Sequence, residues 1–320
     1  MPSLCIVIPA YNESHAIADT IQEYKRAFSN ARIVVVDNNS TDNTSVAAQT
    51  VLDPKSDHLL FEGRQGKGFA VKKGLSRVSA DIYIVTDGDL TYPAQDACRL
   101  FQELLATRAD MVVGDRLSGG SYKSQNTRFG HGFGNTILTA VVSGLSDHSY
   151  RDVLSGLRVV SRPFVSMLDL RSAGFQLESE LNVIAAHLRA DVIEIPIAYR
   201  KRREGSYSKL DTIADGFRIL YFALTNWIAF FPMQAFSIFA LVALTVAAGL
   251  GFRVIAGFIE YGLPYTTTAV AAATAGVCGV LALFTGIILR ILGRNDRRRD
   301  IANFLEVKRQ WNAKLDDQPL

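Results

Sequence analysis

Short apolar runs alternate with longer segments of helical periodicity up to about residue 200. The runs are rich in Val and Ile and too short for helices, so each predicts a buried strand. Strands that alternate with helices predict an α/β fold with a doubly wound, mostly parallel sheet, whose right-handed crossovers bring the strand ends to one edge. The expected strands are 4–8, 33–36, 58–61, 82–85, 111–114, 156–160 and 192–199, and the expected helices begin near 15, 42, 66, 94 and 175.

Two later segments, 219–252 and 261–289, carry no charged residue. A membrane-spanning helix needs about 20 apolar residues, so each segment is long enough to cross a bilayer. The expected spans are about 229–252 and 266–290, with a turn at Gly262 and Pro264.

Apolar residues also recur at helical spacing from Leu210 onward, with charged residues between them. This pattern predicts an amphipathic helix on the membrane surface, although a helix packed on the globular domain fits nearly as well. The expected parts are a cytoplasmic catalytic domain (1–209), the amphipathic helix (210–227), a two-helix anchor (228–292) and a basic cytoplasmic tail (293–320).

Lys and Arg residues are distributed unevenly around the two spans. The upstream flank 200–218 holds six, the downstream flank 290–309 holds seven, and only Arg253 lies between. Positive charge favours the cytoplasmic side, so we expect a multi-pass protein of the inner membrane with both flanks in the cytoplasm. No charged residue lies deep in either span, which disfavours transport through the hairpin.

The bulk composition excludes some classes of protein. The chain has 320 residues, 48% of them hydrophobic, and a mean hydropathy of +0.14. Its net charge of +3 is too weak to argue for nucleic acid. The three cysteines, Cys5, Cys98 and Cys278, are far apart and lack metal-ligand spacing. The N-terminal segment begins with a strand rather than a signal peptide.

The clearest candidate for chemistry is Asp87-Gly88-Asp89, which directly follows an apolar run. Open α/β sheets bind ligands at the carboxyl ends of their strands. Two carboxylates with a substrate diphosphate are a common ligand set for Mg²⁺ or Mn²⁺. The plain alternative is a solvated turn.

The sequence lacks the glycine-rich motifs of a dinucleotide-binding site and of a Walker A loop at the positions where each would occur. The first strand lacks the G-x-G-x-x-G of a dinucleotide site. The segment 63–68 lacks the spacer and the Ser or Thr of a Walker A loop. Gly66-Lys67-Gly68 still offers a helix start and one cation to a phosphate, or forms an ordinary turn.

Several motifs in one order resemble the family 2 glycosyltransferases, and within them the polyprenyl-phosphate glycosyltransferases related to dolichol-phosphate mannose synthase. The resemblance covers about residues 3–225, and 114–118, 131–135 and 152–158 are similar to the bacterial undecaprenyl-phosphate branch. The motifs are Ile8-Pro9-Ala10-Tyr11-Asn12-Glu13, Val36-Asp37-Asn38-Asn39-Ser40-Thr41-Asp42, Gly66-Lys67-Gly68, Asp87-Gly88-Asp89 and Ser206-Tyr207-Ser208-Lys209-Leu210.

The resemblance implies a GT-A fold and an inverting transfer of one sugar from a nucleotide sugar to polyprenyl phosphate. Thr91 stands where mannose synthases often carry a metal-binding Gln, which leaves the third metal ligand open. The implied roles are nucleoside binding by Pro9, Tyr11, Glu13 and Asp37; diphosphate binding by Lys67, Arg202, Ser208 and Lys209; metal binding by Asp87 and Asp89; and acceptor-phosphate binding by Arg116, Arg128 and His131.

Other interpretations remain beside this one. UDP-glucose or UDP-GlcNAc is the favoured donor, with a GDP-mannose-dependent synthase as the alternative and a non-catalytic membrane scaffold less favoured. A processive synthase would carry Q-x-x-R-W, which is missing. His131 could instead be a helix-start residue, Glu178 and Glu180 could orient sugar hydroxyls or face solvent, and a homo-oligomer stays open.

Overall fold

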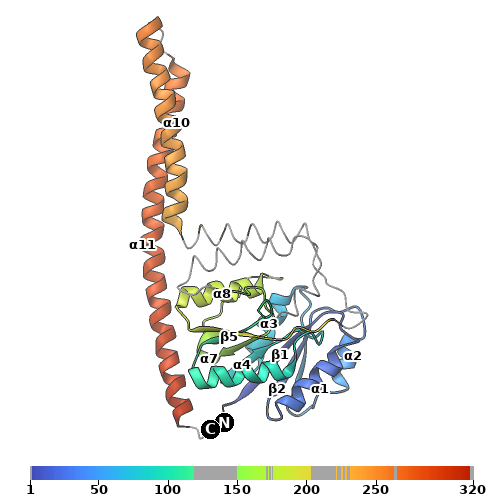
Figure 1. Cartoon of the computed structure of the whole chain (residues 1–320). Helices are drawn as coiled ribbons and strands as arrows, with labels where there is room; N and C mark the ends of the chain where they lie inside the picture. The colour runs from blue at the N-terminus through green and yellow to red at the C-terminus, as the bar shows by residue number, and fades with distance from the viewer. Residues whose placement is uncertain are drawn as a thin grey trace. The chain divides into compact units, whose positions relative to one another are not determined.

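The computed structural model describes residues 2–118, 150–170, 172, 174, 176–202, 221, 225, 228, 231–262 and 265–317. The chain forms two compact units. One contains residues 1–220 and 300–320, and it holds the sheet. The other contains residues 221–299 and holds most of the two long apolar helices (Figure 1).

Seven strands form the sheet of the first unit: β1 (Leu4–Ala10), β2 (Arg32–Asp37), β3 (His58–Phe61), β4 (Ile82–Val85), β5 (Met111–Asp115), β6 (Arg158–Ser161) and β7 (Val192–Pro196). Their spatial order is β3-β2-β1-β4-β6-β5-β7. β1 pairs in parallel with β2 and β4, β2 with β3, and β5 with β7. β6 runs antiparallel between β4 and β5. The predicted mostly parallel sheet is confirmed, with β6 as the exception that the alternation of elements did not reveal.

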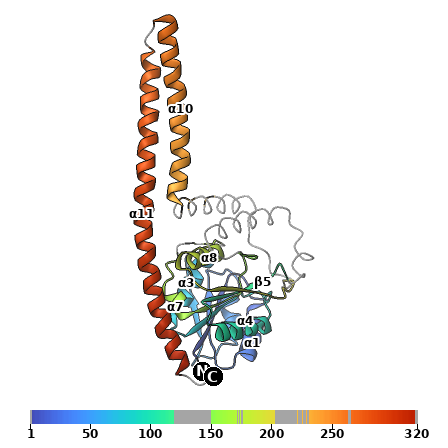
Figure 2. The same cartoon turned by 60° about the vertical axis from the view of Figure 1, so that its left-hand side comes forward.

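Helices cover both faces of this sheet: α1 (Ile17–Ala27), α2 (Thr44–Gln49), α3 (Lys67–Arg77), α4 (Ala94–Thr107), α7 (Arg162–Ser166) and α8 (Leu177–Leu188). Successive strand residues point to opposite faces. Ile6 and Ile8 of β1 therefore pack with α1 and α4, whereas Cys5 and Val7 pack with α3, α7 and α8 (Figure 1 and Figure 2). This two-sided covering is the doubly wound arrangement that the sequence predicted.

Local differences from the sequence expectations have simple causes. The helix expected to be capped by Ser40 or Asp42 begins at Thr44 after Asn43. Asp42 nevertheless accepts hydrogen bonds from the Thr44 N–H at 3.0 Å and from its hydroxyl. The short helix α7 was not predicted; it begins after the N-cap residue Ser161, whose hydroxyl accepts the Phe164 N–H. The expected amphipathic helix at 210–227 lies outside the described residues.

The last helix is longer than the expected second span. It is α11 (Thr266–Asp316), and its residues from 300 onward belong to the first unit. Phe304 is buried in the α3 and α8 side of the core, and Trp311 and Leu315 are buried in the α1 and α4 side. The end of α11 runs beside α7 in both views (Figure 1 and Figure 2). These residues complete the hydrophobic core of the sheet domain.

Two lysines fix this end of α11 to the beginnings of three strands. The Lys308 ammonium lies 2.7 Å from Asp110 and 2.6 Å from Asp191, the residues that precede β5 and β7. Lys314 lies 2.5 Å from Asp81, which precedes β4. The contacts therefore gather at the amino ends of the parallel strands, at the edge of the sheet opposite the one where ligands bind in such folds.

The second unit contains α10 (Pro232–Tyr261) and the part of α11 that precedes residue 300. Each helix has a mean hydropathy of 2.2 over its most apolar window, and large side chains such as Phe252 and Ile259 are exposed. Surfaces this apolar need a partner or a lipid environment. Both helices are long enough to cross a membrane, as the sequence predicted.

Glycines allow the two helices to approach closely. A side chain at Gly257 would collide with the Tyr265 ring, and one at Gly279 would lie 2.8 Å from Leu244. Small residues at contacts between apolar helices are typical of membrane proteins. α10 ends at Gly262, whose φ of +65° suits glycine.

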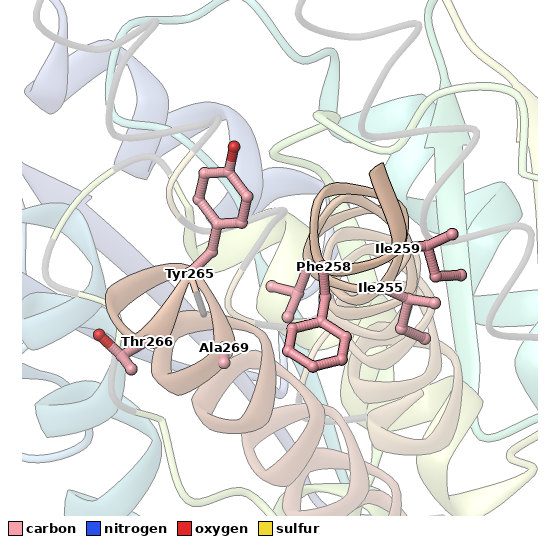
Figure 3. Close-up of a pocket in the computed structure, with 7 residues that line it drawn as sticks. Ile255, Phe258, Ile259, Tyr265, Thr266 and Ala269 are labelled. Carbon is pink, nitrogen blue, oxygen red and sulfur yellow. The ribbon is translucent and has the colours of Figure 1, made fainter. Parts of the chain in front are cut away.

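Near this end of the hairpin lies a cavity of about 310 Å³. Figure 3 shows the side chains of Phe258 and Ile259 on α10, of Tyr265 just before α11, and of Ala269 on α11. The lining is almost entirely apolar, so the cavity lacks the charged groups that a catalytic role would need among the residues that line it.

Candidate active site

The carboxyl ends of the parallel strands bring the motif residues to one edge of the sheet. Ala10 at the end of β1 is in register with Asp37 at the end of β2, and Val7 is in register with Val85 at the end of β4. The segments that follow these three strands therefore lie side by side. The strand pattern predicted that these segments would meet at this edge.

The segment after β1 is held against the segment after β2. The backbone N–H of Asn12 donates to the Ser40 hydroxyl at 3.0 Å, and the Asn12 side chain accepts the Thr41 N–H at 2.8 Å. The Glu13 N–H donates to the Thr44 hydroxyl at 2.8 Å. Asn12 has a φ of +52°, a conformation that Asn tolerates better than most residues. Tyr11 and Glu13, which were predicted to bind the nucleoside, thus flank Asn12 on a well-fixed loop. This loop directly follows β1, the strand that contains Pro9.

Asp37 and Asn38 organise the neighbouring loops. The Asp37 carboxylate is buried and accepts the Ser40 N–H at 2.9 Å and the Ser45 hydroxyl. Asn38 accepts the Gly66 N–H at 2.6 Å and donates to the Arg64 carbonyl at 2.7 Å. Asn38 therefore joins the end of β2 to the start of α3, a role that the sequence analysis did not assign to it.

Lys67, at the start of α3, lies between two carboxylates. Its ammonium is 2.5 Å from Asp87 Oδ1 and 2.6 Å from Glu178 Oε1. Burial alone would raise the pKa of Asp87, but the charge of Lys67 and its hydrogen bond hold that pKa below its usual range. Burial opposes the charged form of Lys67, and the charges of Asp87 and Glu178 overcome it and raise the Lys67 pKa. Asp87 and Lys67 are therefore both charged near neutral pH.

Asp89 has a different environment from Asp87. Its Oδ1 accepts the Thr91 hydroxyl at 2.6 Å and the Thr91 N–H at 3.2 Å, and its Oδ2 lies 2.9 Å from the Arg202 Nε. Burial, followed by the charge of Asp87, raises the pKa of Asp89. Thr91 is fully buried behind Asp89, so it holds the carboxylate in place.

The carboxylate pair fits a divalent cation that also binds a ligand. Among the residues that the structure describes, no group of three or more His, Cys, Asp or Glu residues could hold a metal ion. Two carboxylates with additional oxygens from a diphosphate are nevertheless a normal ligand set for Mg²⁺ or Mn²⁺. Gly156 keeps Asp87 accessible, because a Cβ at this position would lie 2.8 Å from Asp87 Oδ2.

Arg116 lies just beyond β5 and is locked to a buried carboxylate. Its Nε and Nη2 donate to Asp152 at 2.7 and 2.8 Å, which is the planar two-point contact that arginine makes best. The guanidinium carbon also lies 5.6 Å from the centre of the Tyr199 ring. Arg116 was predicted from the sequence, but its partner Asp152 was not, because the two are 36 residues apart.

The loop that carries Asp152 and Gly156 is supported from below by a buried arginine. Arg158 donates to the carbonyls of Val153 and Ser155 at 2.9 and 3.1 Å and to the Asn182 side chain at 2.7 Å. The Gly156 N–H donates to the Tyr92 hydroxyl at 2.8 Å. This loop lies against the predicted metal site, and its support was missed because Arg158 reads as a strand residue.

The structure brings most of the predicted site residues together, and the others lie outside the described residues. Glu178 and Glu180 are both buried, so the solvent-facing alternative is wrong for them; Glu180 accepts the Ser172 N–H at 3.0 Å. The remaining predicted residues, Arg128, His131, Ser208 and Lys209, lie outside the described residues.

Comparison with known proteins agrees with this fold. The profile described as Glycosyl transferase family 2 matches residues 5–159. The chain is 30% identical over 292 residues to the glycosyltransferase AglJ of Haloferax volcanii, covering 89% of this chain and 92% of the relative. It is 27% identical over 267 residues to the dolichol-phosphate mannosyltransferase of Pyrococcus furiosus, covering 81% and 73%.

Among solved structures, glucosyl-3-phosphoglycerate synthase of Mycobacterium tuberculosis in complex with Mn²⁺ and UDP-glucose superposes with a TM-score of 0.52. Identity is 20%, and the match covers 70% of this chain and 78% of that one. The sheet domain has the GT-A fold, and the chain is a glycosyltransferase of family 2.

Proposed function

We propose that this enzyme transfers one sugar, with inversion, from a nucleotide sugar to the phosphate of a polyprenyl lipid such as undecaprenyl phosphate. The observation that carries the proposal is the charged cluster of Asp87, Asp89, Lys67 and Arg202 at the carboxyl edge of a chain with two apolar helices. The name of the Pyrococcus relative supports the lipid acceptor.

In this proposal the chain positions two phosphate groups that repel each other. Lys67 and Arg202 hold the donor diphosphate, and Arg116, fixed by Asp152, holds the acceptor phosphate. A Mg²⁺ or Mn²⁺ ion on Asp87 and Asp89 would supply charge neutralisation for the leaving diphosphate. A lipid phosphate oxygen attacks the anomeric carbon, the bond from that carbon to the diphosphate breaks, and the nucleoside diphosphate leaves. The nucleophile is already anionic, so no strong general base is needed.

The donor sugar is the finer part of the proposal. We favour UDP-glucose or UDP-GlcNAc, and GDP-mannose is the second candidate, because the Pyrococcus relative is named a mannosyltransferase. The test is transfer from each of these radiolabelled donors to a short polyprenyl phosphate in detergent, with extraction of the lipid product. A labelled lipid from one donor supports the proposal, whereas hydrolysis of every donor without a labelled lipid contradicts it.

Arg116→Ala is expected to raise the apparent KM for polyprenyl phosphate at least about tenfold and to change the KM for the donor little, because truncation removes one charge-assisted phosphate contact. Arg116→Lys should recover part of the loss, since lysine keeps the charge but not the planar pair of donors. Initial rates measured against each substrate separately provide the test. A rise in the KM for the donor alone would mean that Arg116 binds the nucleotide sugar and not the acceptor phosphate.

We further propose that the hairpin crosses the inner membrane and that the sheet domain faces the cytoplasm. The lopsided Lys and Arg counts of six and seven against one support this orientation. In a chain whose Cys98 and Cys278 are replaced by serine, Tyr261→Cys should react with an impermeant maleimide in intact cells. Asp317→Cys is the matched control and should react only after permeabilisation. The reverse pattern would contradict the orientation.

A further inference from the structure

Lys67 forms ion pairs with two carboxylates, only one of which belongs to the proposed metal site. Its ammonium bridges Asp87, a proposed metal ligand, and Glu178, which comes from the first turn of α8. The Lys67 side chain is 14% exposed and that of Glu178 is 6% exposed, so neither group is a mobile surface charge. Lys67 is the group through which Glu178 reaches Asp87.

A divalent cation on Asp87 and the ammonium of Lys67 compete for the same carboxylate. Lys67 already lies 2.5 Å from Asp87 Oδ1, and two positive centres that share one carboxylate repel each other. Lysine is a compact charge on a flexible four-carbon stem, so its ammonium can move without a change in the backbone. Glu178, 2.6 Å from the same ammonium, offers it a second carboxylate.

The charges of the cluster show why this second carboxylate matters. Lys67 pairs with both Asp87 and Glu178, whereas Arg202 pairs with Asp89. Without Glu178, Asp87 and Asp89 would be neutralised by the two cations alone. A divalent cation that binds Asp87 would then displace the Lys67 ammonium, and no second carboxylate would accept that ammonium.

We infer that Glu178 is a positioning residue that sets the affinity of the site for its divalent cation by drawing Lys67 away from Asp87. Lys67 then stays beside the cation, anchored to Glu178, where it can meet the donor diphosphate. The inference rests on the metal site of the proposed function, and it adds a role for Glu178 that acts only through Lys67.

The test is a double-mutant cycle on Mn²⁺ affinity, measured on the full chain in detergent by the EPR signal of free Mn²⁺, without any acceptor lipid. Glu178→Gln should weaken Mn²⁺ binding about tenfold, which corresponds to about 1.4 kcal/mol. Lys67→Met should strengthen Mn²⁺ binding in the absence of UDP, because the competitor is gone. In the Lys67→Met background, Glu178→Gln should change the affinity less than about twofold.

Glu180→Gln is the matched control, since Glu180 lies two positions beyond Glu178 on the same helix and accepts the Ser172 N–H, whereas the ion pairs of Lys67 among the described residues are with Asp87 and Glu178. It should leave Mn²⁺ affinity unchanged. Thermal unfolding checks that each variant is folded, and Lys67→Gln replaces Lys67→Met if the latter is not. Equal weakening by Glu178→Gln with and without Lys67 would overturn the inference, because Glu178 would then act as a plain negative charge.

The outcomes also separate this inference from the proposed function. If the effects of Glu178→Gln and Lys67→Met on Mn²⁺ affinity are coupled but no labelled polyprenyl product forms, only the proposed acceptor is contradicted. A labelled product together with uncoupled Mn²⁺ binding would contradict the role of Glu178 alone. A chain that binds no Mn²⁺, with or without UDP, overturns the inference outright.

Discussion

Asp89→Asn is expected to lower kcat for sugar transfer by about 10²–10³, the size of loss found when one preorganised electrostatic contact is removed from an active site. Asparagine has nearly the same shape and can keep a hydrogen bond from Thr91. It loses the charge that pairs with Arg202 at 2.9 Å and that would bind the divalent cation. Initial rates at saturating donor, with Mn²⁺ in excess, measure the effect.

Asp19→Asn is the control for this prediction, because Asp19 is exposed in the first turn of α1, outside the charged cluster. It should retain full activity. Wild-type activity should also disappear with a chelator and return when Mg²⁺ or Mn²⁺ is added. Full activity of Asp89→Asn in the presence of a chelator would remove the metal from the proposed mechanism.

Lys308→Met is expected to lower the free energy of unfolding of the sheet domain by about 3 kcal/mol, since removing one partner of a buried ion pair leaves an uncompensated charge. Asp110 has a side chain with no exposed surface, and Lys308 is its cation. Asp191, the second partner, is 72% exposed and contributes little. Urea unfolding in detergent, followed by tryptophan fluorescence, measures the change.

The neighbouring Arg309→Met provides a matched control. Arg309 is 77% exposed and pairs only with Glu306 on its own helix within the part of the chain that the structure describes. Its replacement should change stability by less than about 0.5 kcal/mol. Adding Asp110→Asn to Lys308→Met should restore most of the loss, because the buried charge is then gone. If both single variants unfold alike, the end of α11 does not stabilise the domain.

The fold could be predicted from the sequence to the extent that its signals are local. The strand that leads to Asp87 and the helix that starts at Lys67 are each marked by a few adjacent residues. The antiparallel direction of β6 has no such mark, because Val159 and Val160 would suit a parallel strand equally well. Direction depends on the long segment before it, whose course cannot be read from a short motif.

The site was predictable in its residue types but not in its contacts. Lys67 and Glu178 are 111 residues apart, so no spacing rule connects them. The family resemblance supplied Lys67 without its second carboxylate.

The end of α11 has an apolar pattern in the sequence that the surrounding charged residues made hard to recognise. Phe304, Trp311 and Leu315 recur at intervals of seven and four, which places them on one helical face. The many Arg and Lys residues around them led instead to the expectation of a basic tail. Composition over a window therefore hid the narrow apolar stripe.

The position of Phe304, Trp311 and Leu315 in the chain has a consequence for biosynthesis. They are translated after both apolar helices, although the core that they fill was begun some two hundred residues earlier. While the ribosome makes the hairpin, the nascent sheet has an uncovered apolar border, and Asp81 and Asp110 have no lysine partner. Such incomplete domains are prone to aggregation. Delayed insertion of the hairpin would therefore prolong the period in which the nascent enzyme needs a chaperone.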